Sequence, residues 1–147
     1  MANLLNDNVK NQVRTAFAQL KEPVQVLFFG TETNCEYCAD TRQLVEEVTA
    51  LSDKLSLSVH DLEKDAALAR QYKMDKAPGL VIAGRDGDQL LDYGIRLAGI
   101  PSGHEFSTLI QDLILFSSRD SGLNQNTRHA LSKLTQPVLL QVFATPT

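Results

Sequence analysis

A nearly continuous apolar run, VQVLFF at residues 24–29, most constrains the fold of this chain. A strand that is apolar at successive positions cannot expose either face to water, so other elements must cover both faces. Apolar residues at helical spacing follow at Leu44, Val45 and Val48, and the alternating segment LSLSVHD at 55–61 predicts a second strand. Such a strand–helix–strand unit predicts two parallel strands joined by a right-handed crossover.

The rest of the chain continues the alternation of helices and strands. Further helices are predicted before Pro23, in the Ala-rich stretch 63–73, after a capping box of Ser102 and Glu105, and at 127–134. Further strands are predicted at 79–84, before a hairpin turn at Asp86-Gly87, and at 138–143. We therefore expect an α/β fold, a three-layer α/β/α sandwich with a mixed central sheet.

Two parts of the chain share one pattern, because residues 13–35 align with residues 127–147. The aligned pairs are Arg14 with Arg128, Ala16 with Ala130, Leu20 with Leu134, and Pro23-Val24 with Pro137-Val138. We interpret the match as an internal duplication, with the chain ending inside the second copy. We predict a complete unit at 1–119 and, at 120–147, a linker with the first helix and strand of a truncated second unit. That strand is expected to dock on the first unit or to join two chains in a homodimer.

Composition and charge argue against several kinds of partner. The net charge is −4, so neither nucleic acid nor an anionic membrane surface is an expected partner. No apolar run approaches the ~20 residues of a membrane-spanning helix. The N-terminal segment MANLLNDNVK has neither the basic nor the apolar region of a secretory signal. These features predict a cytoplasmic protein.

The chain has two cysteines, Cys35 and Cys38, and they allow three interpretations. A structural zinc site needs four ligands, and the histidines, His60, His104 and His129, lie on three different predicted elements, so no metal site is expected. A structural disulfide around so short a loop would stabilise the fold by only about 2 kcal/mol. A redox centre is favoured, because the pair lies between a buried strand and a helix.

The position of the pair predicts different roles for the two thiols. Backbone N–H groups and the dipole at the start of the helix favour a thiolate at Cys35, while Cys38, one turn further in, is shielded. We expect Cys35 to attack a substrate disulfide and Cys38 to resolve the mixed disulfide. Glu32 and Glu36 flank Cys35, and their charge is expected to disfavour its thiolate, unless both point into water. With no carboxylate in the first strand, Asp61 is the candidate proton acceptor.

The motif CEYC at 35–38 after VLFF, followed by KAPG at 76–79, resembles the thioredoxin and glutaredoxin fold. The resemblance implies that Pro78 is a cis-proline opposite the cysteines. It also implies that Ala77 and Pro78 pair with the backbone of the substrate and that Tyr37 packs against it. It implies no cofactor beyond the redox-active disulfide of Cys35 and Cys38.

A longer resemblance covers nearly the whole chain. GIPSGHEF at 99–106 and VFATPT at 142–147 are similar to the N-terminal part of the protein disulfide oxidoreductases built from two thioredoxin-like units. The second CxxC motif of that family is missing here. A related domain, in the flavin-linked partners of peroxide reductases, usually lacks the cysteines of its first unit, so the intact pair favours the disulfide oxidoreductases.

These observations predict an enzyme, a thiol–disulfide oxidoreductase that exchanges electrons with protein disulfides through Cys35 and Cys38. A flavoprotein similar to thioredoxin reductase is the partner that the resemblance suggests. The alternative is a noncatalytic interaction or structural half of a tandem thioredoxin-like protein.

Overall fold

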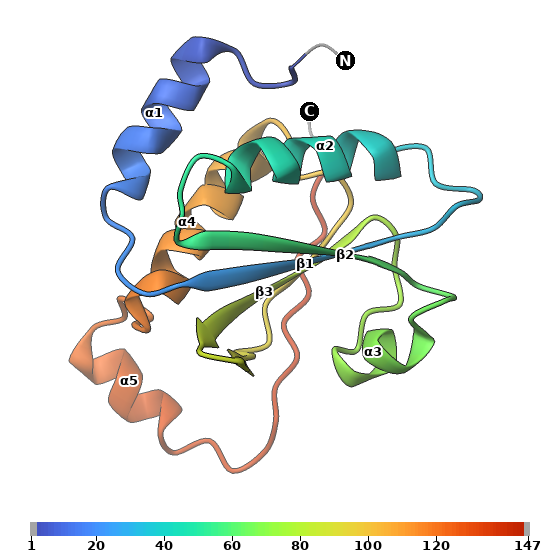
Figure 1. The fold of residues 1–147 in the computed structure, drawn as a ribbon. Coiled ribbons are helices and arrows are strands. Elements are labelled where there is room, and N and C mark those ends of the chain that lie inside the picture. The colour runs from blue at the N-terminus through green and yellow to red at the C-terminus, as the bar shows by residue number, and fades with distance from the viewer. Residues whose placement is uncertain (1–2, 146–147) are drawn as a thin grey trace.

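In the computed structural model, which describes residues 3–145, the chain folds around a five-stranded mixed sheet (Figure 1). The strands are β1 (Val24–Gly30), β2 (Leu55–Asp61), β3 (Gly79–Asp86), β4 (Gln89–Leu91) and β5 (Arg96–Ala98). Their order is β2-β1-β3-β4, and β5 also pairs with β3. β1 and β2 are parallel and β3 is antiparallel to β1, so the predicted mixed sheet is confirmed.

Helices cover both faces of the sheet, which gives three layers (Figure 1). The helices are α1 (Asp7–Phe17), α2 (Cys38–Thr49), α3 (Ala66–Gln71), α4 (His104–Ser118) and α5 (Gln125–Leu131). Side chains of α1, α2 and α4 form the larger core on one face, and α3 covers the other face. The fold is the α/β sandwich that the sequence predicts. Within residues 3–145 no helix is both long and apolar enough to cross a membrane.

β1 is the centre of both cores, because all seven of its residues are buried. Val24, Val26 and Phe28 point into the core under α1, α2 and α4, whereas Leu27 and Phe29 point toward α3. The alternation of side chains along a strand thus explains why the sequence is apolar at successive positions. The result fixes the carboxyl end of β1, from which the cysteine loop leaves.

Two side chains near the end of α4 hold the segment that enters β1. The hydroxyl of Ser117 accepts a hydrogen bond from the Lys21 N–H at 2.7 Å and donates one to the Glu22 carbonyl at 2.7 Å. The guanidinium of Arg119 donates to the carbonyls of Pro23 and Arg85 at 2.8 and 2.9 Å. These bonds tie the start of β1 to both α4 and β3.

Two helix starts differ from the prediction. α4 is capped by Gly103, with φ of 60° and no side-chain capping bond, so the predicted capping box of Ser102 and Glu105 does not form. Glycine adopts this left-handed conformation without the steric cost of a side chain. α2 begins at Cys38, so Cys35 precedes the helix and Cys38, predicted one turn further in, is its first residue.

The predicted strand at 138–143 is wrong, because the structure has no regular element after α5 in the described residues. The apolar side chains from Val138 to Phe143 are 64–91% exposed, so this segment does not dock on the sheet of its own chain either. The homodimer through this segment and the division of the chain at residue 120 stay predictions.

Candidate redox site

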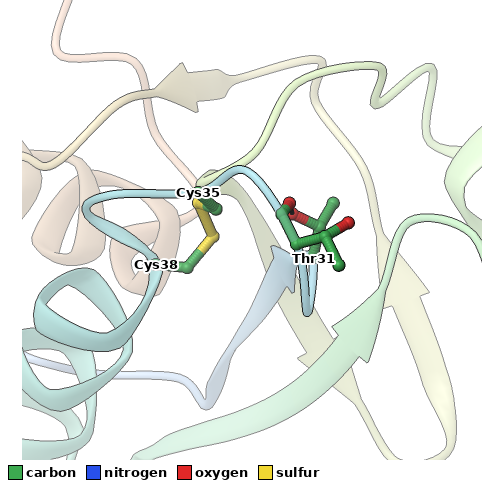
Figure 2. The surroundings of a disulfide bond; sticks show 4 residues. Thr31, Cys35 and Cys38 are labelled. Atoms are coloured by element: carbon green, nitrogen blue, oxygen red, sulfur yellow. Dashed lines mark hydrogen bonds between the residues drawn. A yellow bond between two sulfur atoms is a disulfide. The ribbon is translucent and has the colours of Figure 1, made fainter.

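Cys35 and Cys38 form a disulfide at the carboxyl end of β1, with their Cα atoms 5.4 Å apart (Figure 2). Cys35 is half-buried at the edge of the larger core, whereas Cys38 is buried, with 9% of its surface exposed. Cys35 is therefore the more accessible of the two sulfur atoms to an incoming partner, as the sequence predicts.

The first turn of α2 leaves backbone N–H groups available beside the disulfide. Tyr37 is the N-cap and makes no side-chain capping bond, and the first intrahelical bond runs from the Thr41 N–H to the Tyr37 carbonyl at 2.9 Å. The N–H groups of the preceding residues of the turn have no carbonyl partner within the helix. Their partial positive charge favours a thiolate formed at this end of the helix.

Gly30 allows the disulfide to pack directly against the end of β1. A Cβ added at this position would lie 2.8 Å from a ring carbon of Phe28 and 3.5 Å from the Cys38 sulfur. A larger residue would displace the Phe28 ring, so the glycine is required by close packing. The sequence contains Gly30, but its spacing alone does not reveal this contact.

The Ala77–Pro78 peptide bond is cis, as the resemblance implies. Pro78 directly precedes β3, whose first residue, Gly79, pairs with Phe29 near the end of β1. The loop before β3 and the cysteine loop therefore leave the same end of the sheet. The Pro78 carbonyl accepts a hydrogen bond from the Gly99 N–H at 2.9 Å, which fixes this loop against the segment after β5.

The flanking residues named from the sequence lie in different surroundings. Glu32 forms an ion pair and hydrogen bond with Lys64, so its negative charge is partly neutralised. Glu36 is exposed and takes part in no ion pair among the described residues. Tyr37, between the cysteines, is 48% exposed and can contact a partner. Of the two glutamates, Glu36 is the stronger candidate for an effect on Cys35.

Asp61 is poorly suited to accept a proton. Its carboxylate accepts hydrogen bonds from the backbone N–H groups of Lys64 and Glu63 at 3.0 and 2.9 Å. These bonds hold the pKa of Asp61 below its ordinary value of 3.8, with a smaller contribution from the Lys64 charge. A carboxylate with a lowered pKa is a weaker base, which argues against the sequence-based assignment.

A groove of about 630 Å³ opens beside Cys38, between the start of α2 and the end of β2. Carboxylates of Glu32, Asp61 and Asp65 line it together with His60, whose ring contacts the Ser58 hydroxyl at 2.9 Å. Neither Cys35 nor Pro78 lines this groove, so it reaches the buried sulfur from the side opposite the predicted substrate contacts. No group of three or more potential metal ligands occurs within residues 3–145.

Comparisons with known proteins agree with this geometry. The crystal structure of a protein disulfide oxidoreductase from Aeropyrum pernix has a TM-score of 0.77 and 27% identity, and the match covers 88% of this chain and 55% of that one. The N-terminal domain of the alkyl hydroperoxide reductase from Enterococcus faecalis has a TM-score of 0.75, with 24% identity over 85% of this chain and 58% of that one. This chain has the thioredoxin-like fold.

In sequence, the thioredoxin-like chain is 28% identical over 116 residues to an alkyl hydroperoxide reductase of Xanthomonas campestris. The match covers 76% of this chain but only 18% of that relative, so the chain spans about a fifth of the proteins it matches. No family model matches the chain. The similarity therefore joins it to a domain of larger redox proteins, and the activities of the whole relatives do not transfer to it directly.

Sequence reasoning missed Thr41, a second polar residue of the thioredoxin-like core beside the disulfide. Its side chain is fully buried on the inward face of α2, three residues after Cys38. The spacing placed it near the cysteine, but a threonine in a helix usually bonds to the carbonyl one turn earlier. Only the structure shows that its hydroxyl has no partner.

Proposed function

We propose that this chain is a thiol–disulfide oxidoreductase that exchanges electrons with protein disulfides through Cys35 and Cys38. The observation that carries the proposal is the position of the disulfide, with one accessible and one buried sulfur at the start of α2. An accessible attacking thiol and a shielded resolving thiol are what exchange through a mixed disulfide requires.

In the reducing direction, the Cys35 thiolate attacks one sulfur of a substrate disulfide, and the other substrate sulfur leaves as a thiolate. Cys38 then loses its proton and attacks the Cys35 sulfur, which releases the second substrate thiol. The substrate disulfide gains two electrons and two protons, and the Cys35–Cys38 bond is formed. The oxidising direction is the reverse of these steps.

The substrate contacts are proposed at the end of the sheet where the two loops lie together. Ala77 and Pro78 would pair with the backbone of the partner, and the exposed ring of Tyr37 would pack against it. The exposed carboxylate of Glu36 would raise the pKa of the Cys35 thiol in the reduced state, because it disfavours a second negative charge nearby.

The electron donor is proposed to be a flavoprotein similar to thioredoxin reductase. The support is the similarity in sequence to the alkyl hydroperoxide reductase of Xanthomonas campestris, in which the matching region is a small part of a larger protein. Each reduction of a substrate leaves Cys35 and Cys38 as a disulfide, so a donor of two electrons must return them to the dithiol state.

Trapping of the mixed disulfide tests the assigned roles. The Cys38→Ser variant keeps the attacking thiol and removes the resolving one, so it should accumulate a stable adduct with a disulfide-containing protein such as insulin. Non-reducing electrophoresis and mass spectrometry measure the adduct. Cys35→Ser is the matched control and should form at least tenfold less of it, because its remaining thiol is buried.

Equal trapping by the two variants would contradict the assignment of Cys35 as the nucleophile. An absence of adduct in both variants would favour the alternative, in which this chain is a noncatalytic half of a tandem protein.

A further inference from the structure

The hydroxyl of Thr41 stands apart from every other buried polar group in the described chain. Thr41 has no exposed surface, and its Oγ1 is the only buried side-chain nitrogen or oxygen in residues 3–145 without a hydrogen-bond partner. A buried hydroxyl without a partner destabilises a folded protein, so an unpartnered group that persists requires an explanation.

Thr41 lies beside the buried sulfur of the redox pair. It follows Cys38 by three residues in α2, and side chains at this spacing are neighbours on one face of a helix. Helical side chains also lean toward the N-terminus, so the Thr41 side chain lies over the turn that contains Cys38. Both residues are buried and point toward the core.

A second threonine in the same helix shows what Thr41 does not do. The Thr49 hydroxyl is also buried and donates to the Val45 carbonyl, one turn earlier, at 2.8 Å. The corresponding acceptor for Thr41 is the Tyr37 carbonyl, which accepts only the Thr41 backbone N–H. The Thr41 hydroxyl is therefore left available, although the usual acceptor is within the same turn.

We propose that Thr41 is a positioning residue whose hydroxyl donates a hydrogen bond to the Cys38 sulfur when the disulfide is reduced. This inference rests on the proposed thiol–disulfide exchange. Two glutathione thiols reduce the Cys35–Cys38 bond to two thiols and become one glutathione disulfide, with transfer of two electrons and two protons. Reduction frees the Cys38 sulfur to rotate and to accept a hydrogen bond, and a thiolate accepts it more strongly than a disulfide sulfur.

The consequence is a bias toward the reduced state. The hydroxyl is unsatisfied in the disulfide form and satisfied in the dithiol form, so it favours reduction on both counts. It also favours the Cys38 thiolate, because a hydrogen bond to the charged form lowers a pKa. Thr41 would therefore make Cys38 a better attacking group when it resolves the mixed disulfide.

The test is the equilibrium of the pair with glutathione redox buffers in the full chain, comparing the wild type with Thr41→Val. Valine keeps the shape and removes the hydroxyl. We expect the equilibrium of the variant to shift about tenfold toward the disulfide, which equals a potential about 30 mV more negative. Thr41→Ser, which keeps the hydroxyl, should stay within about twofold of the wild type. Thr41→Ala replaces Thr41→Val if the valine variant does not fold.

Thr49→Val is the matched control, because it removes a buried hydroxyl from the same helix away from the cysteines. Its potential should equal that of the wild type although its stability changes. An unchanged potential in Thr41→Val, or an equal shift in Thr49→Val, would overturn the inference. A shift in Thr41→Val alone would support it even if the wild type failed to form the mixed disulfide, so the two proposals fail separately.

Discussion

The two copies of the repeated pattern fold alike in their helices and differently in their strands. α1 ends at Phe17 and α5 ends at Leu131, and in both copies the residue three positions later bonds back to that carbonyl. The distance is 3.0 Å from the Leu20 N–H to Phe17 and 3.0 Å from the Leu134 N–H to Leu131. The aligned residues thus form the same helix end and the same turn.

After this turn the copies diverge. β1 is fully buried between β2 and β3, whereas the aligned apolar segment from Val138 to Phe143 is exposed and forms no strand. A helix makes its hydrogen bonds within its own segment, but a strand needs neighbours on which to pair. The comparison teaches that the same local sequence specifies a helix by itself and a strand only in company.

The entry into the strand differs as well. The segment before β1 is held by the side chains of Ser117 and Arg119, which bond to its backbone from α4. The aligned segment at 134–137 is exposed along its whole length. Burial of α1 in the core adds a further difference, since α5 has no buried residues.

The largest expected effect comes from a pair of phenylalanines that each follow a proline by six residues. Phe29→Ala removes a fully buried ring from β1 and should destabilise the fold by about 3–5 kcal/mol. Phe143→Ala removes a ring that is 88% exposed and should change the stability by less than about 0.5 kcal/mol. Urea unfolding of both variants measures the contrast.

A loss of more than about 2 kcal/mol in Phe143→Ala would break the comparison, because it would mean that the second segment is packed in solution. A self-associating chain would reveal itself in the same experiment through a dependence of the unfolding midpoint on protein concentration.

A smaller effect is expected from the helix caps, which are chemically matched in the two copies. The Asn6 side chain accepts the Val9 N–H at 2.9 Å, and the Asn124 side chain accepts the Thr127 N–H at 2.9 Å. Asn6→Ala should lower global stability by about 1 kcal/mol, because α1 packs in the core.

Asn124→Ala should leave global stability unchanged and increase amide hydrogen exchange only in α5, since that helix is unpacked. Equal losses of global stability in the two variants would show that α5 folds cooperatively with the rest of the chain, contrary to the comparison.

Much of the fold could be predicted from the sequence where local pattern and burial agree. β2 has the predicted bounds, and β1 begins at the predicted residue, because their apolar patterns match a covered sheet. The strand at 138–143 could not be predicted correctly from its composition, because pairing depends on neighbours that the local pattern does not contain. The start of α2 at Cys38 depends on the loop geometry around Tyr37.

The site divides in the same way. The cysteine pair was evident from its place between a strand and a helix, and the cis bond before Pro78 came from the resemblance alone. The ion pair of Glu32 with Lys64 and the unpartnered hydroxyl of Thr41 depend on side-chain orientation, which no spacing in the sequence encodes.

The measurement that tests the account most directly is the reduction of insulin by dithiothreitol, followed as turbidity, with the wild type and the Cys35→Ser variant. The account predicts that the wild type accelerates precipitation well above the dithiothreitol blank and that the variant falls to the blank, because the accessible sulfur carries the exchange. A wild type no faster than the blank would contradict the claim that this thioredoxin-like unit is catalytic by itself.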